Sequence, residues 1–114
     1  MDAVEINAGG WYLRALRSDE RVDDRPALAD GNIDDPDYVA TRARQWADDT
    51  RYSWAVCQPN TGELLAEVGL IPHADNVADL VGWARAGHED ALTTGSEAVR
   101  RFAEGALGFK VVAK

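Results

Sequence analysis

Residues 61–71 read Thr-Gly-Glu-Leu-Leu-Ala-Glu-Val-Gly-Leu-Ile, and this stretch decides the fold class. Its first two residues complete a turn that begins at Pro59, a pattern typical of a hairpin connection. The residues that follow are apolar almost without interruption, which is too continuous for a strand that has one face in water. We therefore predict that residues 63–71 form a strand covered on both faces.

The flanking segments supply partners for this strand. Residues 52–57, before the turn, are predicted to pair with it as a hairpin, and residues 77–84 return as a further strand after a turn at 72–76. These three strands form an antiparallel meander. An earlier strand is predicted over residues 11–17, and the acidic segment 19–37 is interpreted as a connector.

A helix is predicted between the connector and the meander. Asp37 is a candidate N-cap, and the helix should run to about Asp49. Val39, Ala43 and Trp46 recur at the spacing of one apolar stripe, so this helix is expected to pack on the sheet through them.

A second helix and a last strand follow the meander. Residues 85–94 lack periodicity, and Thr94-Gly95-Ser96-Glu97 has the pattern of a capping box, so a helix is predicted to begin at Thr94. Gly108 supplies a stop, and Phe109 to Ala113 is predicted as the fifth strand. A right-handed crossover of this kind makes the last strand parallel to residues 77–84. The predicted fold class is α/β, with one mixed, mainly antiparallel sheet and helices on both faces.

Composition limits the classes of function. The 114 residues include 12 Lys and Arg against 20 Asp and Glu, a net charge of −8, which repels a phosphate backbone, so nucleic acid is not an expected partner. The single cysteine, Cys57, forms no internal disulfide, and no Cys/His cluster has metal-site spacing. No apolar run approaches the ~20 residues of a membrane span. A cytoplasmic protein without a membrane partner is expected.

This order of elements resembles the GNAT acetyltransferase superfamily through its fifth strand. The sequence is similar to the branch that acetylates the N-termini of ribosomal proteins, where a Thr-Gly-Glu turn leads into a strand ending Gly-Leu-Ile. Gly82-Trp83 and Ser96-Glu97-Ala98-Val99 match further motifs of that branch. The resemblance covers about residues 11–112. It implies a single GNAT-like domain over residues 1–114 that lacks the family's last helix and two strands.

The resemblance implies acetyl-CoA as the cofactor. The family's phosphate-binding loop, Arg or Gln, two residues, Gly, one residue, then Gly or Ala, aligns with Asp90-Ala91-Leu92-Thr93-Thr94-Gly95. Asp90 replaces a cation and Thr93 replaces a glycine, so we expect a poor phosphate cradle and weak binding. The implied cofactor contacts are Trp83, Ala84 and Arg85 on the strand and Thr93, Thr94, Gly95 and Ser96 at the helix start.

Glu67 is the candidate catalytic residue. A carboxylate on this strand acts as a general base if burial raises its pKa, and the alternative is a solvated or hydrogen-bonded strand residue. The family's tyrosine general acid has no match in this sequence. His73 and His88 are interpreted as solvated loop residues, and Cys57 as a core residue.

Two hypotheses on function stay open. One is an acetyl-CoA-dependent N-acetyltransferase, weak or inactive, that acts on a primary amine of a small molecule or peptide. The other is a non-catalytic binding or assembly module that has lost acetyl-CoA binding. In both, the strand from Phe109 to Ala113 presents an unpaired edge, so a homodimer or a partner chain is expected there.

Overall fold

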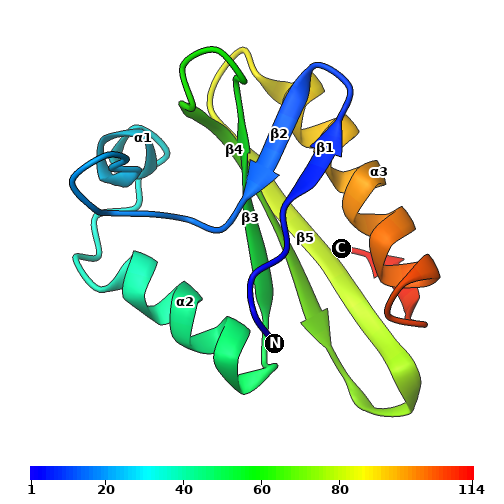
Figure 1. Ribbon diagram of the computed structural model, residues 1–114. Helices are drawn as coiled ribbons and strands as arrows, with labels where there is room; N and C mark the ends of the chain where they lie inside the picture. The colour runs from blue at the N-terminus through cyan, green and yellow to red at the C-terminus, as the bar shows by residue number, and fades with distance from the viewer.

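The computed structural model describes residues 1–114 and contains one six-stranded sheet and three α-helices (Figure 1). The strands lie in the sheet in chain order, antiparallel except that β6 runs parallel to β5. This confirms the predicted mixed, mainly antiparallel fold. The elements are β1 Ile6–Ala8, β2 Trp11–Arg14, α1 Arg25–Asp30, α2 Tyr38–Asp48, β3 Tyr52–Cys57, β4 Leu64–Pro72, the 3-10 turn Ala74–Asn76, β5 Val77–Ala84, α3 Glu89–Gly105 and β6 Lys110–Ala113.

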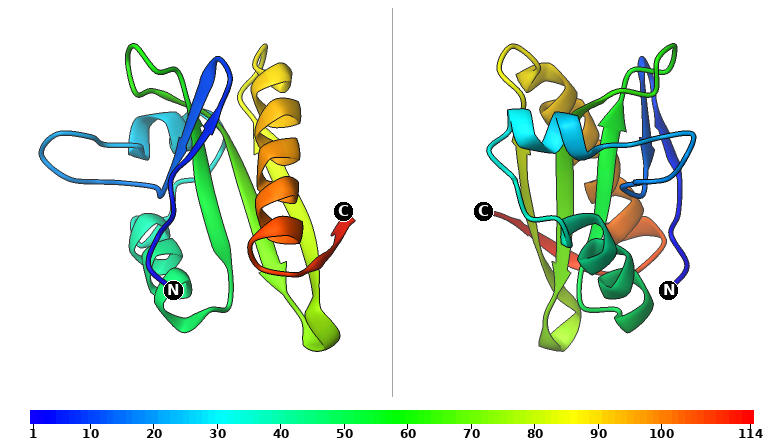
Figure 2. Two further views of the ribbon diagram at one scale, coloured as in Figure 1. Left: turned by 45° about the vertical axis from the view of Figure 1, so that its right-hand side comes forward. Right: turned by 90° about the vertical axis from the view of Figure 1, so that its left-hand side faces the viewer.

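The helices cover the two faces of the sheet. Figure 2 shows α1 and α2 on one face and α3 on the other. The first seven residues of β4 are all buried, which confirms the prediction of a strand covered on both sides. No helix is both long enough and apolar enough to cross a membrane.

The predicted meander is confirmed. β3 and β5 have the predicted bounds, and β4 is displaced by one residue from its prediction. The final crossover also agrees, because α3 leads into a strand that pairs in parallel with β5 from Val77 to Leu80.

The predicted start of the second helix was wrong. α3 begins at Glu89, so Thr94 lies in its second turn and the irregular loop is confined to residues 85–88. Glu89 and Asp90 lie in the first turn, where carboxylates are favoured by the helix dipole. No glycine or proline separates them from the apolar helix face, so the helix extends back through the segment expected to be a loop.

The N-terminal half differs from the prediction in three places. The first strand ends at Arg14, and β1 precedes it across a Gly-Gly turn in which Gly9 has φ +61°. The connector contains the short helix α1, which has Pro26 in its first turn. On α2, Ala43 is exposed and Arg42 faces the sheet in its place, while Asp37 precedes the helix without a side-chain capping bond.

The aromatic core forms where β3 meets α2 and α3. Trp54 is fully buried, and the rings of Trp46 and Phe102 pack edge-on against it at centroid distances of 5.0 and 6.0 Å. Such edge-to-face pairs are favourable beyond the apolar area that they bury. Trp46 and Trp54 are therefore core residues.

Candidate functional site

Glu67 is fixed by a buried hydrogen-bond network between β4, β5 and α2. Its side chain is 1% exposed. Oε1 accepts hydrogen bonds from the Tyr38 hydroxyl at 2.6 Å and the Trp83 indole at 3.0 Å, and Oε2 accepts one from Arg42 Nε at 3.2 Å. These three donors occupy three of the acceptor positions of the carboxylate oxygens.

This network limits what Glu67 can do chemically. Burial and the hydrogen bond to Glu67 raise the pKa of Tyr38 above its ordinary value, so the phenol remains a donor. Glu67 keeps one further acceptor position, but its side chain is enclosed, so no substrate amine reaches it in this conformation. The arrangement matches the alternative interpretation, a hydrogen-bonded strand residue.

A cleft opens where β6 leaves β5. The last backbone hydrogen bond between them joins the amide of Lys114 to the carbonyl of Leu80. The backbone N–H and C=O groups of alternate residues point to the same edge of a strand. Those of Gly82 and Ala84 therefore point, like those of Leu80, to the edge of β5 that β6 occupies, but β6 pairs with β5 only as far as Leu80. Gly82 is accordingly exposed, although it lies inside a six-stranded sheet.

Side chains of α3 form the opposite wall of this cleft. Arg100 also donates a 3.4 Å hydrogen bond to the carbonyl of Val111 on β6. The volume is about 400 Å³, and the lining residues are Leu80, Val81, Gly82, Leu92, Thr93, Ser96, Glu97, Arg100, Ala113 and Lys114. The lining combines apolar surface with hydroxyl groups, the carboxylate of Glu97 and the cations of Arg100 and Lys114, which suits a flexible, mostly neutral arm.

The first turn of α3 does not provide a phosphate cradle. Glu89 and Asp90 place two carboxylates there, and Asp90 Oδ1 accepts a hydrogen bond from the amide of Ala91. The amides of residues 93–96 belong to later helical turns and donate within the helix. Thr93 also turns its hydroxyl to the carbonyl of Glu89 at 3.1 Å. Bare amides, which bind phosphate at helix starts, are therefore absent at Thr93 to Ser96.

Gly95 has a packing role in this structure. It is buried, and a Cβ atom built on it would lie 2.7 Å from Cγ2 of Val56. The absent side chain lets α3 approach β3 closely. Gly95 therefore faces the core, and its small size does not expose backbone to a ligand.

The remaining predicted contact residues lie on different sides of β5. Trp83 points to the α1 and α2 face, where its indole binds Glu67, and Arg85 forms ion pairs with Asp30 and Glu63 at 2.8 and 2.6 Å. Ala84 does not line the cleft and packs against the main core. Of the predicted side-chain contacts, the structure brings Thr93 and Ser96 together at the cleft.

Sequence reasoning missed the partners of Glu67 and of His73. Tyr38 and Arg42 lie one turn apart on α2, but their role depends on the packing of α2 on β4. His73 is an exposed residue of the turn, as predicted, but its Nε2 lies 2.7 Å from Asp79 Oδ2, a contact that was not predicted. The turn between β4 and β5 brings these two together, and strand pairing across that turn was the available signal.

No family model and no curated protein matches the chain. Solved structures do match. A protein described as a ribosomal-protein-serine acetyltransferase from Vibrio cholerae superposes with a TM-score of 0.79 at 15% identity, over 96% of this chain and 72% of that one. Mycobacterium smegmatis RimJ in complex with CoA-disulfide superposes with a TM-score of 0.72 at 14% sequence identity. The match covers 97% of this chain and 66% of that one. An acetyltransferase from Agrobacterium tumefaciens superposes with a TM-score of 0.71 at 17% sequence identity. The match covers 99% of this chain and 74% of that one.

This chain has the GNAT acetyltransferase fold. The fold predicted from the order of elements is thereby confirmed. Within this GNAT fold, the cleft beside β5 and the enclosed Glu67 lie on opposite faces of the same strand pair.

Proposed function

We propose that this chain is an acetyl-CoA-dependent N-acetyltransferase-like protein with weak donor binding and low activity. The observation that carries the proposal is the cleft where β6 leaves β5, lined by Gly82, which lies beyond the last residue of β5 that pairs with β6. An extended thioester arm fits there as an additional strand-like partner of β5. The acetyltransferase descriptions of the structural neighbours, one of them solved with CoA-disulfide, support this choice of donor.

The proposed reaction is a direct transfer. A primary amine of a small molecule or peptide attacks the carbonyl carbon of the thioester, forming the new N–C bond. The C–S bond breaks, and the proton lost by the amine ends on the departing thiol. Backbone amides of β5 polarise the acyl oxygen. We expect a low rate because Glu67, the only predicted base, is enclosed by Tyr38, Arg42 and Trp83.

A second candidate is a non-catalytic binding module on the same scaffold. Two observations favour it: the enclosed carboxylate of Glu67 and the carboxylates of Glu89 and Asp90 in the first turn of α3. In this case the cleft binds an arm-like ligand or stays empty, and no transfer follows.

Calorimetric titration with acetyl-CoA tests the donor cleft. Thr93 is exposed and lines the cleft, so Thr93→Trp fills it without changing the core. Glu104→Trp is the matched control, since Glu104 is exposed on α3 outside the cleft. We expect binding by the wild-type chain and the control, and at least a tenfold loss in Thr93→Trp. Equal binding by all three would place the donor elsewhere.

Release of free thiol from acetyl-CoA separates the two candidates. The chain itself gives no background with a thiol reagent, because Cys57 is 0% exposed and burial raises its pKa to about 11. Slow thiol release that depends on an added primary amine supports the transferase. No thiol release, together with no acetyl-CoA binding in the titration, supports the non-catalytic module.

A further inference from the structure

Arg51 is a half-buried arginine without an acidic partner. It precedes β3, and its only hydrogen bond within the chain runs from Nε to Ser53 Oγ at 3.1 Å. Arg14, Arg42 and Arg85, which are also partly or wholly enclosed, each form an ion pair with a carboxylate. The two terminal nitrogens of Arg51 therefore have donors with no acceptor in the protein.

The guanidinium of Arg51 lies across β4 at Gly69. A Cβ atom built on Gly69 would lie 2.6 Å from its Nη2. Gly69 is two residues after Glu67, so both positions face the α1 and α2 side of the sheet. The Arg51 guanidinium thus fills the space that a side chain at Gly69 would occupy. On this face of β4, that position follows directly after the buried Glu67.

This part of the sheet is open on the same side. On β5, Ala78 and Leu80 are buried against α3, while the alternating residues Asp79 and Val81 are only half-buried. The right-hand view of Figure 2 shows α1 and α2 in front of the sheet, with much of β5 uncovered beside them. The terminal nitrogens of Arg51 are not fully buried, because every fully buried side-chain nitrogen in the structure has a hydrogen-bond partner and these two have none.

The charged groups around Arg51 leave one positive charge without a negative partner. Glu67 is the only carboxylate of the network, and Arg42 already pairs with it at 3.2 Å. Burial and the neighbouring Arg42 lower the pKa of Arg51, so both its environment and its neighbour disfavour the unpaired cation. The half-buried Asp79 is engaged by His73 at 2.7 Å and by Lys114 at 3.9 Å.

We propose that Arg51 binds the carboxylate of a small-molecule ligand on the open face of β4 and β5. A planar guanidinium fork matches a carboxylate in geometry, and one negative charge balances the local excess. In the setting of the proposed function, on which this step rests, the ligand is the acceptor and carries a carboxylate as well as the reacting amine. Binding of the carboxylate itself does not require that function.

Amide chemical shifts of Gly69 and Ser53 in the isotope-labelled chain test the proposal. The probes are L-alanine, L-alaninamide, propionate and inorganic phosphate. We expect saturable shifts with alanine and propionate, and none with alaninamide, which keeps the amine but lacks the carboxylate. Stronger binding of phosphate than of propionate would overturn the carboxylate assignment.

Two variants locate the contact. Arg51→Gln removes the charge and should weaken propionate binding at least tenfold, whereas Arg101→Gln, at an exposed position on α3, should leave it unchanged. Gly69→Ala keeps the charge but displaces the guanidinium, and it decides the matter if Arg51→Gln fails to fold. Unchanged propionate binding in Gly69→Ala would overturn the proposal. Propionate binding without any acetyl-CoA binding would remove the transferase and leave the Arg51 site standing.

Discussion

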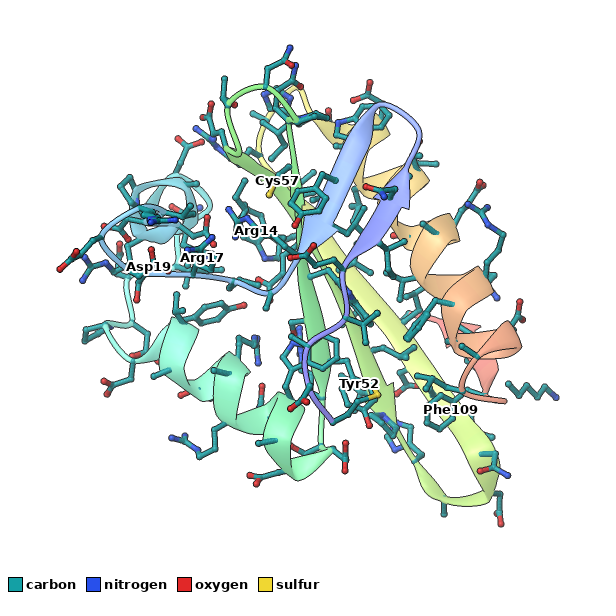
Figure 3. All side chains as sticks on the ribbon, viewed as in Figure 1. Arg14, Arg17, Asp19, Tyr52, Cys57 and Phe109 are labelled. Carbon is teal, nitrogen blue, oxygen red and sulfur yellow. The ribbon has the colours of Figure 1, made fainter.

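The guanidinium of Arg14 forms two hydrogen bonds of 2.8 Å to the carboxylate of Asp24, and both side chains are buried. Arg14 also donates to the carbonyl of Gly62, and Asp24 accepts from the amide of Arg17. The pair therefore joins β2, the connector before α1 and the turn between β3 and β4. The Arg14 side chain points from β2 toward that connector (Figure 3).

Removal of either partner should strongly destabilise the fold. Arg14→Ala leaves a buried carboxylate unpaired, and we expect a loss of about 3–5 kcal/mol in the free energy of unfolding. Urea denaturation measures it. Arg17→Ala is the control, because it breaks only the exposed pair with Asp19 and should not move the midpoint. Equal midpoints for the two variants would contradict a structural role for the Arg14 and Asp24 pair.

How far the sequence predicts this molecule depends on the range of the interactions involved. β3, β4 and β5 could be predicted from local patterns, because turn residues and continuous apolar runs determine structure within a few positions of the chain. The Arg14 and Asp24 pair joins residues whose partners are set by tertiary packing, so no local pattern indicates it. The start of α3 was mispredicted because Thr94 to Glu97 has the pattern of a capping box, whereas the helix begins five residues earlier, at the acidic turn of Glu89 and Asp90.

The candidate site was predicted only in part. The sequence analysis placed its candidate cofactor contacts on the β5 segment and on the helix that follows it, and the structure has a cleft between these two elements. The enclosure of Glu67 was not predictable, because Tyr38 and Arg42 reach it only after α2 packs on the sheet. Arg51 gave no signal at all, since its position over Gly69 depends on strand pairing.

Alkaline pH should destabilise the fold through its tyrosines. Burial and a hydrogen bond to Asp49 raise the pKa of Tyr52 to about 12, and Tyr38 shifts in the same direction. Because these folded-state values exceed the ordinary value of 10.0, the stabilisation is complete below about pH 10 and is lost as the pH rises toward 12. Urea midpoints across this range should fall, and Tyr52→Phe should reduce the fall. A pH-independent midpoint would contradict the assignment.

We propose that two copies of the chain pair through β6. The amide of Lys114 donates to β5, so by alternation the amides of Val111 and Ala113 face away from it. The neighbouring side chain of Val112 is 38% exposed. Such an edge recruits another strand. Sedimentation equilibrium should show a dimer that Val111→Pro or Val112→Lys weakens, and a monomer at all micromolar concentrations would contradict the pairing.

Restoring the family loop should strengthen donor binding. Asp90→Arg replaces a repulsive carboxylate with a cation, and Thr93→Gly weakens the second helical turn so that its amides become accessible. Together they should improve acetyl-CoA affinity by ~1–3 kcal/mol in calorimetry. Glu104→Arg makes the same change of charge far along α3 and should have little effect. An equal gain in that control would mean that net charge alone governs binding.

Comparison of acetyl-CoA with S-acetylpantetheine in calorimetric titrations tests the central claim most directly, namely that the β5 cleft takes the thioester arm without a phosphate cradle in α3. The two ligands share the arm, and only acetyl-CoA carries the nucleotide. We expect both to bind with affinities within a few-fold of each other and weaker than about 1 μM, roughly −8 kcal/mol. Submicromolar binding of acetyl-CoA with at least a tenfold preference over S-acetylpantetheine would contradict the account, because the protein would then recognise the phosphates.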